Sequence, residues 1–195
     1  ALVDIGSGNT KGGYVMSAPG SGKHFQIFSM KFGTKSLARK RQAAAAGGPE
    51  EGGKSFAQMA RQVAESDLRP AIQKMLIDAG PVLAQRSRSY LNGGLPWAVA
   101  TTQNPTNTDR YVPLTQAAID RFCALAVTDQ KALFTVDTRG IVNPDHKKLI
   151  EGDLAKLSDT SVKPIFTAEE YMAGAELLRI LSQEMRMAEK TLFFT

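Results

Sequence analysis

Apolar and polar residues alternate in three short runs within the first thirty positions. The runs are Leu2–Ile5, Gly13–Ser17 and Phe25–Met30, and the turn between the last two contains Pro19, Gly20 and Gly22. Short alternating runs that are separated by turn residues are typical of β-strands joined by tight connections. The first thirty residues are therefore predicted to form three consecutive antiparallel strands.

The apolar period becomes helical after Ser55. Phe56, Met59 and Val63 begin a pattern that continues to Ala79, so one long helix is expected there. Pro70 lies inside this pattern and should kink or divide the helix, because proline removes a backbone hydrogen bond and clashes with the preceding turn. The dipeptide at 80–81, Gly-Pro, should end it.

The rest of the chain alternates between predicted helices and strands. Helices are expected at 114–125 and 145–157, and after the capping box Thr167-Ala-Glu-Glu170. The remaining apolar runs predict a buried strand at Trp97–Thr101, a short strand at Ala132–Val136, and two further strands at Val162–Phe166 and Thr191–Thr195.

This order of elements, β-β-β-α-β-α-β-α, predicts an α/β fold. We expect a mixed sheet of about five strands with helices on its faces. Residues 1–190 are expected to form one domain, with a flexible low-complexity loop at 42–54 and an insertion at about 130–160. Residues 191–195 are expected to begin a strand that leads into a second domain.

Composition adds few constraints. The 195 residues, 43% of them hydrophobic, are enough for one domain with a core of its own. No apolar run reaches the length of a membrane span, and the start has no secretory pattern. The single cysteine, Cys123, is predicted to be a buried thiol. Together with the missing span and secretory pattern, a lone cysteine favours a cytoplasmic location without a membrane. His24 and His146 are too far apart in the sequence to suggest a metal site.

The net charge of +5 is concentrated in one segment. Five cations lie within eleven residues: Lys31, Lys35, Arg39, Lys40 and Arg41. Such a cluster can guide a polyanion toward a site, or it can simply be a solvated loop. Because residues 38–46 contain no aromatic side chain, stacking of nucleic-acid bases has no support there.

The richest chemistry lies directly after the first predicted strand, where Asp4 is followed by a glycine-serine-glycine turn. A carboxylate at a strand end can hold Mg²⁺ or orient a water, and small turn residues let backbone N–H groups approach an anion. The same residues also suit a plain β-hairpin, with Asp4 capping the turn. The candidate phosphate-binding residues are Gly6, Ser7, Gly8, Asn9, Thr10 and Lys11.

This block resembles the first phosphate motif of the actin-like ATPase superfamily. The resemblance implies a ribonuclease H-like half-domain that holds phosphate and Mg²⁺ against a second, related domain or chain. Asp4 would then hold the metal or a water. A homodimer is a further possibility that this resemblance leaves open.

Within that superfamily the chain looks most similar to the exopolyphosphatase/guanosine-pentaphosphate phosphohydrolases. The order of elements is similar, the predicted strand ending in Thr101-Thr102 is followed by a polar loop with Asn107, and Ile165–Glu170 resembles the segment that opens the last helix of the first domain. In that family a glutamate of this segment positions the attacking water, which implies a catalytic role for Glu169 or Glu170. A glutamate at 170 is also what a capping box requires for helix stability alone.

The resemblance implies an Mg²⁺-dependent hydrolase of polyphosphate or guanosine pentaphosphate. One departure concerns an arginine that the family usually has a few residues beyond the 98–102 strand, where this chain has Pro105. Arg110, Lys35 or Arg39 would have to replace it. Two alternatives stay open. Lys11 and the glycine-rich turn also suit an actin-like filament-forming ATPase, and the missing arginine suggests a catalytically silent relative that acts as a scaffold or binding module.

A second phosphate motif competes with the first. Residues 48–55 match the P-loop spacing Gly-x₄-Gly-Lys-Ser, and the predicted strand before Asp137 resembles a magnesium-holding strand. However, no apolar strand precedes the loop, and Glu50 and Glu51 would place negative charge in an anion cradle. The simpler interpretation is a glycine-rich linker in which Ser55 caps the following helix.

Overall fold

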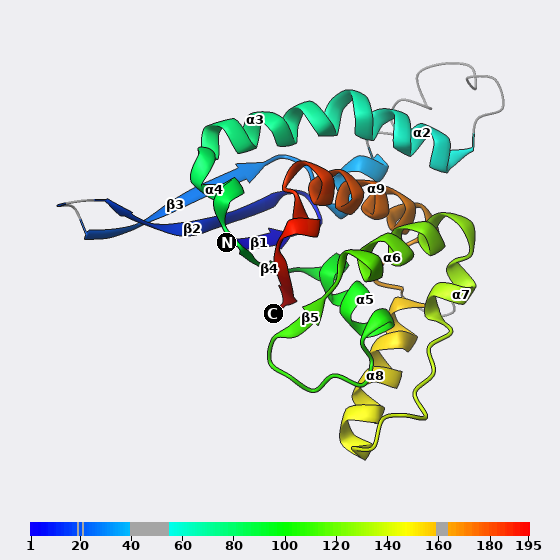
Figure 1. The fold of residues 1–195 in the computed structure, drawn as a ribbon. Helices are drawn as coiled ribbons and strands as arrows, with labels where there is room; N and C mark the ends of the chain where they lie inside the picture. Colours follow the sequence, from blue (N-terminus) through cyan, green and yellow to red (C-terminus); the bar gives the residue numbers. More distant parts are fainter. Residues whose placement is uncertain (19, 21, 40–54, 159–163) are drawn as a thin grey trace.

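The computed structural model describes residues 1–18, 20, 22–39, 55–158 and 164–195. Within these ranges the chain forms a mixed six-stranded open sheet with helices packed against it, which is an α/β fold (Figure 1). Its strands lie in the order β3-β2-β1-β4-β6-β5. Their bounds are β1 Leu2–Ile5, β2 Thr10–Ala18, β3 Gly22–Met30, β4 Arg88–Asn92, β5 Val112–Leu114 and β6 Thr191–Phe194.

Neighbouring strands are antiparallel at three of the five pairings and parallel at the other two. β2 runs antiparallel to both of its neighbours, β1 and β3. β4 is parallel to β1 and β6 is parallel to β4, whereas β5 at the edge is antiparallel to β6. The carboxyl ends of β1, β4 and β6 therefore lie along one edge of the sheet, where ligands bind in many open α/β sheets.

The helices occupy the connections after β3. Residues 34–39 are helical. The labelled helical elements are α2 Phe56–Val63, the π-helical turn η1 Ala64–Leu68, α3 Arg69–Ala79, α4 Pro81–Gln85, α5 Gly94–Gln103, α6 Gln116–Thr128, α7 Gln130–Phe134, α8 Pro144–Leu157, α9 Ala168–Glu184 and the 3₁₀ turn η2 Met187–Glu189. Among these described helices, none has both the length and the apolar character needed to cross a bilayer.

Several predicted elements are confirmed. The three N-terminal strands form, and the long helix after Ser55 is divided by a π-helical turn just before Pro70, which lies in the first turn of α3. Gly80, with φ of 82°, ends α3. The helix predicted at 145–157 is α8, and the capping box at Thr167 opens α9.

Two predicted strands are wrong. Trp97–Thr101 lies inside helix α5, and Ala132–Val136 overlaps helix α7. Short buried apolar runs have no periodicity that separates strand from helix, which explains both errors. The strand expected at Val162–Phe166 falls partly outside the described residues, and Pro164–Phe166 is not extended sheet.

The sheet itself contains more strands than the five expected. β4 and β5 were both missed, the first because Arg88–Asn92 is short and mostly polar. The segment Thr191–Phe194 is a strand as predicted, and it lies inside this sheet between β4 and β5. The second domain predicted to follow it stays a prediction.

The two faces of the sheet differ. Val3, Ile5 and Leu91 point to a fully buried face, against which the helices pack. On that side α3 packs against β3, and the hydroxyl of Tyr14 in β2 donates a hydrogen bond to the carbonyl oxygen of Ala79. α9 runs through the centre of this layer between α2 and α6 (Figure 1).

Candidate functional site

Asp4 lies near the carboxyl end of β1, between two polar partners on neighbouring strands. In the strand register it is paired with Lys11 of β2 and with Asn92 of β4. The Nζ of Lys11 lies 3.5 Å from Oδ2 of Asp4, and the two side chains are 57% and 27% exposed. The carboxylate is therefore accessible from solvent, and a cation is held beside it.

The turn after Asp4 is closed by one internal hydrogen bond and is also hydrogen-bonded to the segment that follows β3. The N–H of Gly6 donates to the carbonyl oxygen of Asn9 at 2.9 Å, which closes the turn. The carbonyl of Gly6 accepts from the N–H of Thr34 at 3.0 Å, and the carbonyl of Ser7 accepts from the N–H of Lys35 at 2.8 Å. The segment after β3 thus fixes the carbonyl side of the turn.

Two glycines of this region have opposite surroundings, and one of them lets another backbone segment approach the turn closely. A Cβ on Gly33 would lie 2.4 Å from the carbonyl oxygen of Gly6, so only glycine can occupy that position without a shift. Gly8 is different, because nothing lies within 4 Å of the position that its Cβ would take. The Cα of Gly8 therefore faces open space, whereas the backbone nitrogens of Gly8 and Asn9 lie next to Gly33, 2.7 and 2.6 Å from the position that a Cβ on Gly33 would take.

Helix α5 begins directly beside Asp4. Gly93, which precedes it, has φ of 104°, and a Cβ there would lie 2.2 Å from the carbonyl oxygen of Ile5 and 3.2 Å from Oδ1 of Asp4. No side chain caps this helix, and its amino terminus, which carries the positive end of the helix dipole, lies beside the carboxyl end of β1. This end of the molecule favours a negatively charged ligand.

The segment that precedes α9 reaches the same region. The Nζ of Lys35 lies 3.4 Å from Oε2 of Glu170 and donates to the carbonyl oxygen of Ile165 at 3.2 Å. It also lies 5.9 Å from the centre of the Phe166 ring, which in turn packs on Gly94 of α5. Residues 33–36, the start of α5 and the start of α9 are therefore held together.

Glu170 has a structural function at this position. Its Oε2 accepts a hydrogen bond from the backbone N–H of Thr167 at 2.9 Å, and the hydroxyl of Thr167 accepts from the N–H of Glu170. The capping box that the sequence predicts is thus confirmed. Glu169 lies beside it in the first turn of α9 and is half-buried. Glu170 is linked to the turn after Asp4 through Lys35, whose Nζ pairs with Glu170 and whose backbone N–H donates to the carbonyl oxygen of Ser7.

The remaining predicted cations are spread out. Lys31 and Arg39 are exposed and Lys35 is partly buried, while Lys40 and Arg41 lie outside the described residues. Arg110 does not contact the site, since its guanidinium carbon lies 5.6 Å from the centre of the Tyr111 ring, just before β5. Most of the competing P-loop motif, residues 48–54, also lies outside the described residues. Its last member, Ser55, caps α2 as expected.

A magnesium ion would find few protein ligands here. Within the described part of the chain, no group of three or more His, Cys, Asp or Glu side chains is arranged to hold a metal. Asp4, with the amide of Asn92 as its register partner, supplies one carboxylate. This set suits Mg²⁺, which proteins often bind through one or two carboxylates together with substrate phosphates and waters.

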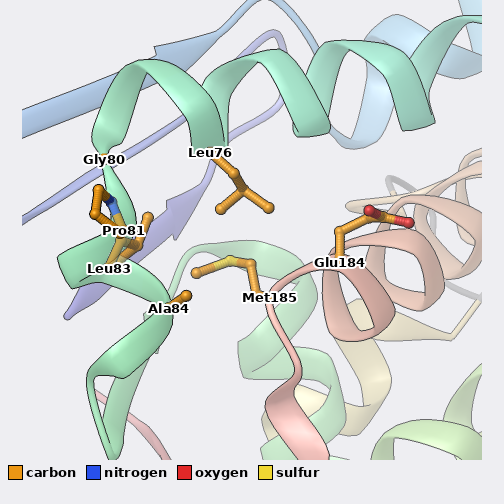
Figure 2. Close-up of a pocket in the computed structure, with 7 residues that line it drawn as sticks. All are labelled: Leu76, Gly80, Pro81, Leu83, Ala84, Glu184 and Met185. Carbon is orange, nitrogen blue, oxygen red and sulfur yellow. The ribbon is translucent and has the colours of Figure 1, made fainter.

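A small pocket lies at the opposite end of the sheet (Figure 2). It has a volume of about 80 Å³, and Leu76 of α3 and Met185 extend into it. Glu184 on its border is held by Arg69 and Gln73. The pocket is much smaller than the roughly 300–1,000 Å³ of typical ligand sites, so we assign it no function.

Known proteins offer no guide to this site. The sequence matches no model of a known protein family, and no curated protein is significantly similar to it. The function must therefore be argued from the residues and their arrangement.

Sequence reasoning missed three residues that shape the site: Gly33, Asn92 and Gly93. The run Asn-Gly-Gly at 92–94 was the available signal, because a polar residue and two glycines after an apolar pair are typical of a strand end followed by a turn. The signal was missed because the strand of this region was predicted at 97–101, whereas it lies at Arg88–Asn92.

Proposed function

We propose that this chain is the ribonuclease H-like half of an Mg²⁺-dependent phosphoanhydride hydrolase, similar to the exopolyphosphatase/guanosine-pentaphosphate phosphohydrolases of the actin-like superfamily. The observation that carries the proposal is the convergence around Asp4. The carboxylate, the 6–9 turn, the start of α5 and the Lys35–Glu170 pair all lie at the carboxyl ends of β1 and β4.

The layout of the sheet supports this choice of fold family. Three antiparallel strands come first, and two strands parallel to β1 extend the sheet on the other side. A three-stranded antiparallel unit followed by strand–helix units is the layout that the resemblance implies. It is also found outside this superfamily, so the proposal depends on the site as well.

In the proposed site, Asp4 binds Mg²⁺ or a metal-bound water. The ion would neutralise charge on the substrate's phosphate oxygens, which lowers the barrier to displacement of the terminal phosphoryl group. Lys11, beside Asp4, would contact a phosphate oxygen. A phosphate would approach the turn where the Cα of Gly8 faces open space, with Ser7 and Asn9 beside it. The predicted contact from Thr10 is not available, because its side chain is fully buried and its hydroxyl donates to the carbonyl oxygen of Phe32 at 2.9 Å.

The attacking water would be positioned by a glutamate at the start of α9. Because Oε2 of Glu170 is already held by Thr167 and Lys35, Glu170 is fixed in orientation, which is a useful property for a residue that must place a water. Glu169 is the second candidate. Lys31 and Arg39, which are exposed, would attract the polyanionic substrate from outside.

Such a site works between two domains, because one half supplies only part of the phosphate shell. The first test is therefore phosphate release by the longest natural protein that contains this chain. It would be incubated with Mg²⁺ and, separately, with polyphosphate, guanosine pentaphosphate and ATP. The substitutions Asp4→Asn, Glu169→Gln and Glu170→Gln should each lower the rate by at least about a hundredfold if the residue takes part in chemistry.

A matched control is Asp78→Asn, which removes an exposed carboxylate from the distant helix α3, where it pairs only with Lys74. That variant should keep full activity. Release from polyphosphate or pentaphosphate, lost on Asp4→Asn, is the expected outcome. Release from ATP alone, with ATP-dependent sedimentation, would instead favour the filament-forming alternative. No release from any substrate would overturn the hydrolase proposal in favour of a scaffold.

A further inference from the structure

The exposed face of the sheet carries a continuous row of apolar side chains. The strand register pairs Ile27 with Gly13, Gly13 with Leu2, Leu2 with Tyr90, Tyr90 with Phe193, and Phe193 with Pro113. These residues, together with Phe25, are called the apolar row below. Because cross-strand partners point to the same face, the row crosses all six strands, a width of about 24 Å at ~4.8 Å per strand.

The side chains of the apolar row are exposed to solvent, although the solvent-facing side of a sheet normally carries polar side chains. Ile27 is 69% exposed, Phe25 57% and Leu2 40%. The ring of Phe25 lies over Gly13, where a Cβ would be 2.5 Å from its Cε1, so the glycine leaves no gap in the row. Val15, the register partner of Phe25, is 48% exposed and widens the row at this end.

The other end of the row is aromatic. Tyr90 and Phe193 stack with ring centres 5.5 Å apart, and Tyr111 packs edge-on against Tyr90 at 5.6 Å. These rings form a preassembled apolar surface rather than separate side chains. Contiguous exposed apolar surface of this kind marks interaction sites on proteins.

Charge on this face has one predominant sign. Lys11, Lys23 and Arg88 point to it from β2, β3 and β4. The only carboxylate in the sequences of the six strands is Asp4, and Lys11 already pairs with it. Arg110 adds a further cation next to Tyr111 at the aromatic end.

From this pattern we propose that the apolar row is the docking surface for an amphipathic α-helix of a partner protein, one whose apolar stripe is bordered by acidic residues. The helix would bury its stripe on the row and place its carboxylates opposite Lys23 and Arg88. A helix layer is the usual way in which a sheet buries an apolar face, as α3 does against β3 on the other side.

Two other occupants suit the surface less well. A second copy packed face to face would bring the same cations close together, and like charges oppose such an interface. Single-stranded nucleic acid would suit the cations and the rings at the aromatic end. Leu2, Val15 and Ile27, however, are aliphatic and offer no ring on which bases stack along the rest of the row. The proposal concerns the sheet face and is independent of the phosphate chemistry around Asp4.

The test uses a fluorescein-labelled helical peptide of about 18 residues, with leucines at i, i+3, i+4 and i+7 spacing and glutamates on both borders. Two control peptides carry lysine in place of glutamate, or the same residues in scrambled order. Binding is followed by fluorescence anisotropy. Methyl NMR of the protein locates the contact, since Leu2, Val15 and Ile27 report on this face and Ile77 reports on α3.

The acidic peptide should shift the signals of Leu2, Val15 and Ile27, and leave that of Ile77 unchanged. Ile27→Ser should weaken binding by about tenfold or more, which is the loss expected for one buried aliphatic side chain. The matched control Ile77→Ser removes an isoleucine that is 79% exposed on α3 and should have no effect. Lys23→Glu with Arg88→Glu should weaken the acidic peptide and strengthen the lysine peptide.

The proposal fails if the acidic peptide does not bind, if the scrambled peptide binds equally well, or if Ile27→Ser leaves its affinity unchanged. Analytical ultracentrifugation of the chain alone provides a second test. A dimer that Ile27→Ser dissolves would assign the face to a second copy. Tighter binding of oligothymidine than of the acidic peptide, lost on Tyr90→Ala, would assign it to nucleic acid. Melting temperatures close to that of the unsubstituted chain would show that the variants fold.

Discussion

Lys35 and Glu170, which lie 135 positions apart in the sequence, form an ion pair with Nζ 3.4 Å from Oε2. The two residues belong to the two segments that the sequence singles out for phosphate chemistry, the basic run after β3 and the first turn of α9. Lys35 also binds the carbonyl of Ile165, so it fastens the start of α9 to the turn beside Asp4. These tertiary contacts join the two segments.

The Glu170 side chain caps helix α9 and also carries a negative charge that pairs with Lys35. Two substitutions separate the effect of the cap from the effect of the charge. Glu170→Gln keeps the capping box, because glutamine serves at that position, and loses only the ion pair with the partly exposed Lys35. Its free energy of unfolding should stay within about 0.5 kcal/mol of the unsubstituted chain. Glu170→Ala should lose about 1 kcal/mol, measured by urea unfolding.

If phosphate release falls equally in both variants, the charge of Glu170 takes part in the reaction. If it falls only in Glu170→Ala, in step with stability, the glutamate serves the helix alone. The comparison thus tests the catalytic role without assuming that every loss of activity comes from chemistry.

Two glycines of the turn region should respond differently to alanine. Gly33→Ala puts a Cβ 2.4 Å from a backbone oxygen, which cannot move cheaply, and should destabilise the fold by about 2–3 kcal/mol. Gly8→Ala meets nothing within 4 Å and should change stability by less than about 0.5 kcal/mol. Thermal unfolding of both variants checks this difference.

Gly8→Ala also probes the proposed phosphate site. A methyl group at the open tip of the turn blocks the approach of an anion to the backbone, so affinity for tripolyphosphate in the presence of Mg²⁺ should fall in a stably folded protein. Unchanged affinity would remove the 6–9 turn from the phosphate site, whatever the result for Gly33→Ala.

How far the sequence predicts this fold depends on how local each signal is. The N-cap at Ser55, the capping box at Thr167 and the break near Pro70 were predicted correctly, because caps and proline act within a few residues. The three N-terminal strands were predicted for the same reason, since alternation is a local pattern. Pairing of β4 and β6 depends on residues about 100 positions apart and left no local trace.

The strand that was wrongly predicted at 97–101, inside helix α5, shows more clearly what an apolar pattern cannot predict. The residues of Ala98–Thr102 are buried on all sides, so neither a strand-like nor a helix-like alternation is present. Misplacing this element also hid the glycine pair at 93–94, which shapes the site next to Asp4. The sequence alone proposes Asp4 and residues 6–11 as candidates, whereas the position of Gly33 against the turn emerges only from the tertiary structure.

Glu65 should make the stability of the fold depend on pH in the acid range. It forms ion pairs with Arg69 and Arg179, and the hydrogen bonds from these guanidinium groups lower the pKa of Glu65 from 4.5 to about 2. The unfolded state therefore binds more protons between these values. The contribution of Glu65 is fully present above pH 4.5 and is lost as the pH falls toward 2.

Urea unfolding midpoints measured from pH 6 to pH 2.5 would test this expectation. The difference between the unsubstituted chain and Glu65→Gln should be largest near neutral pH and shrink below pH 4.5. Because the Glu65 side chain is 42% exposed, the difference should be modest and should decrease in 0.5 M salt. If the difference in unfolding midpoint between the two proteins does not change with pH, the charge of the Glu65 carboxylate is not what stabilises the fold.

Cys123 should be chemically inert in the folded protein. It lies on α6 against α9, where its thiol donates to the carbonyl oxygen of Ala175 at 3.4 Å. Burial, reinforced by the charges of Glu176 and Asp120, raises the pKa of the thiol from 9.0 to about 12. Since only the thiolate reacts, labelling by a disulfide reagent at pH 8 should be slow in the native state and fast in guanidinium.

The same shift has a consequence for stability in alkali. The unfolded chain loses the Cys123 proton near pH 9, whereas the folded chain keeps it to about pH 12, so stability should fall as the pH rises through this interval. Cys123→Ala removes that dependence and serves as the control, at a cost of about 1 kcal/mol for the lost packing. Rapid labelling of the native protein at pH 8 would contradict this account, because it requires a thiolate that the packing of α6 on α9 excludes.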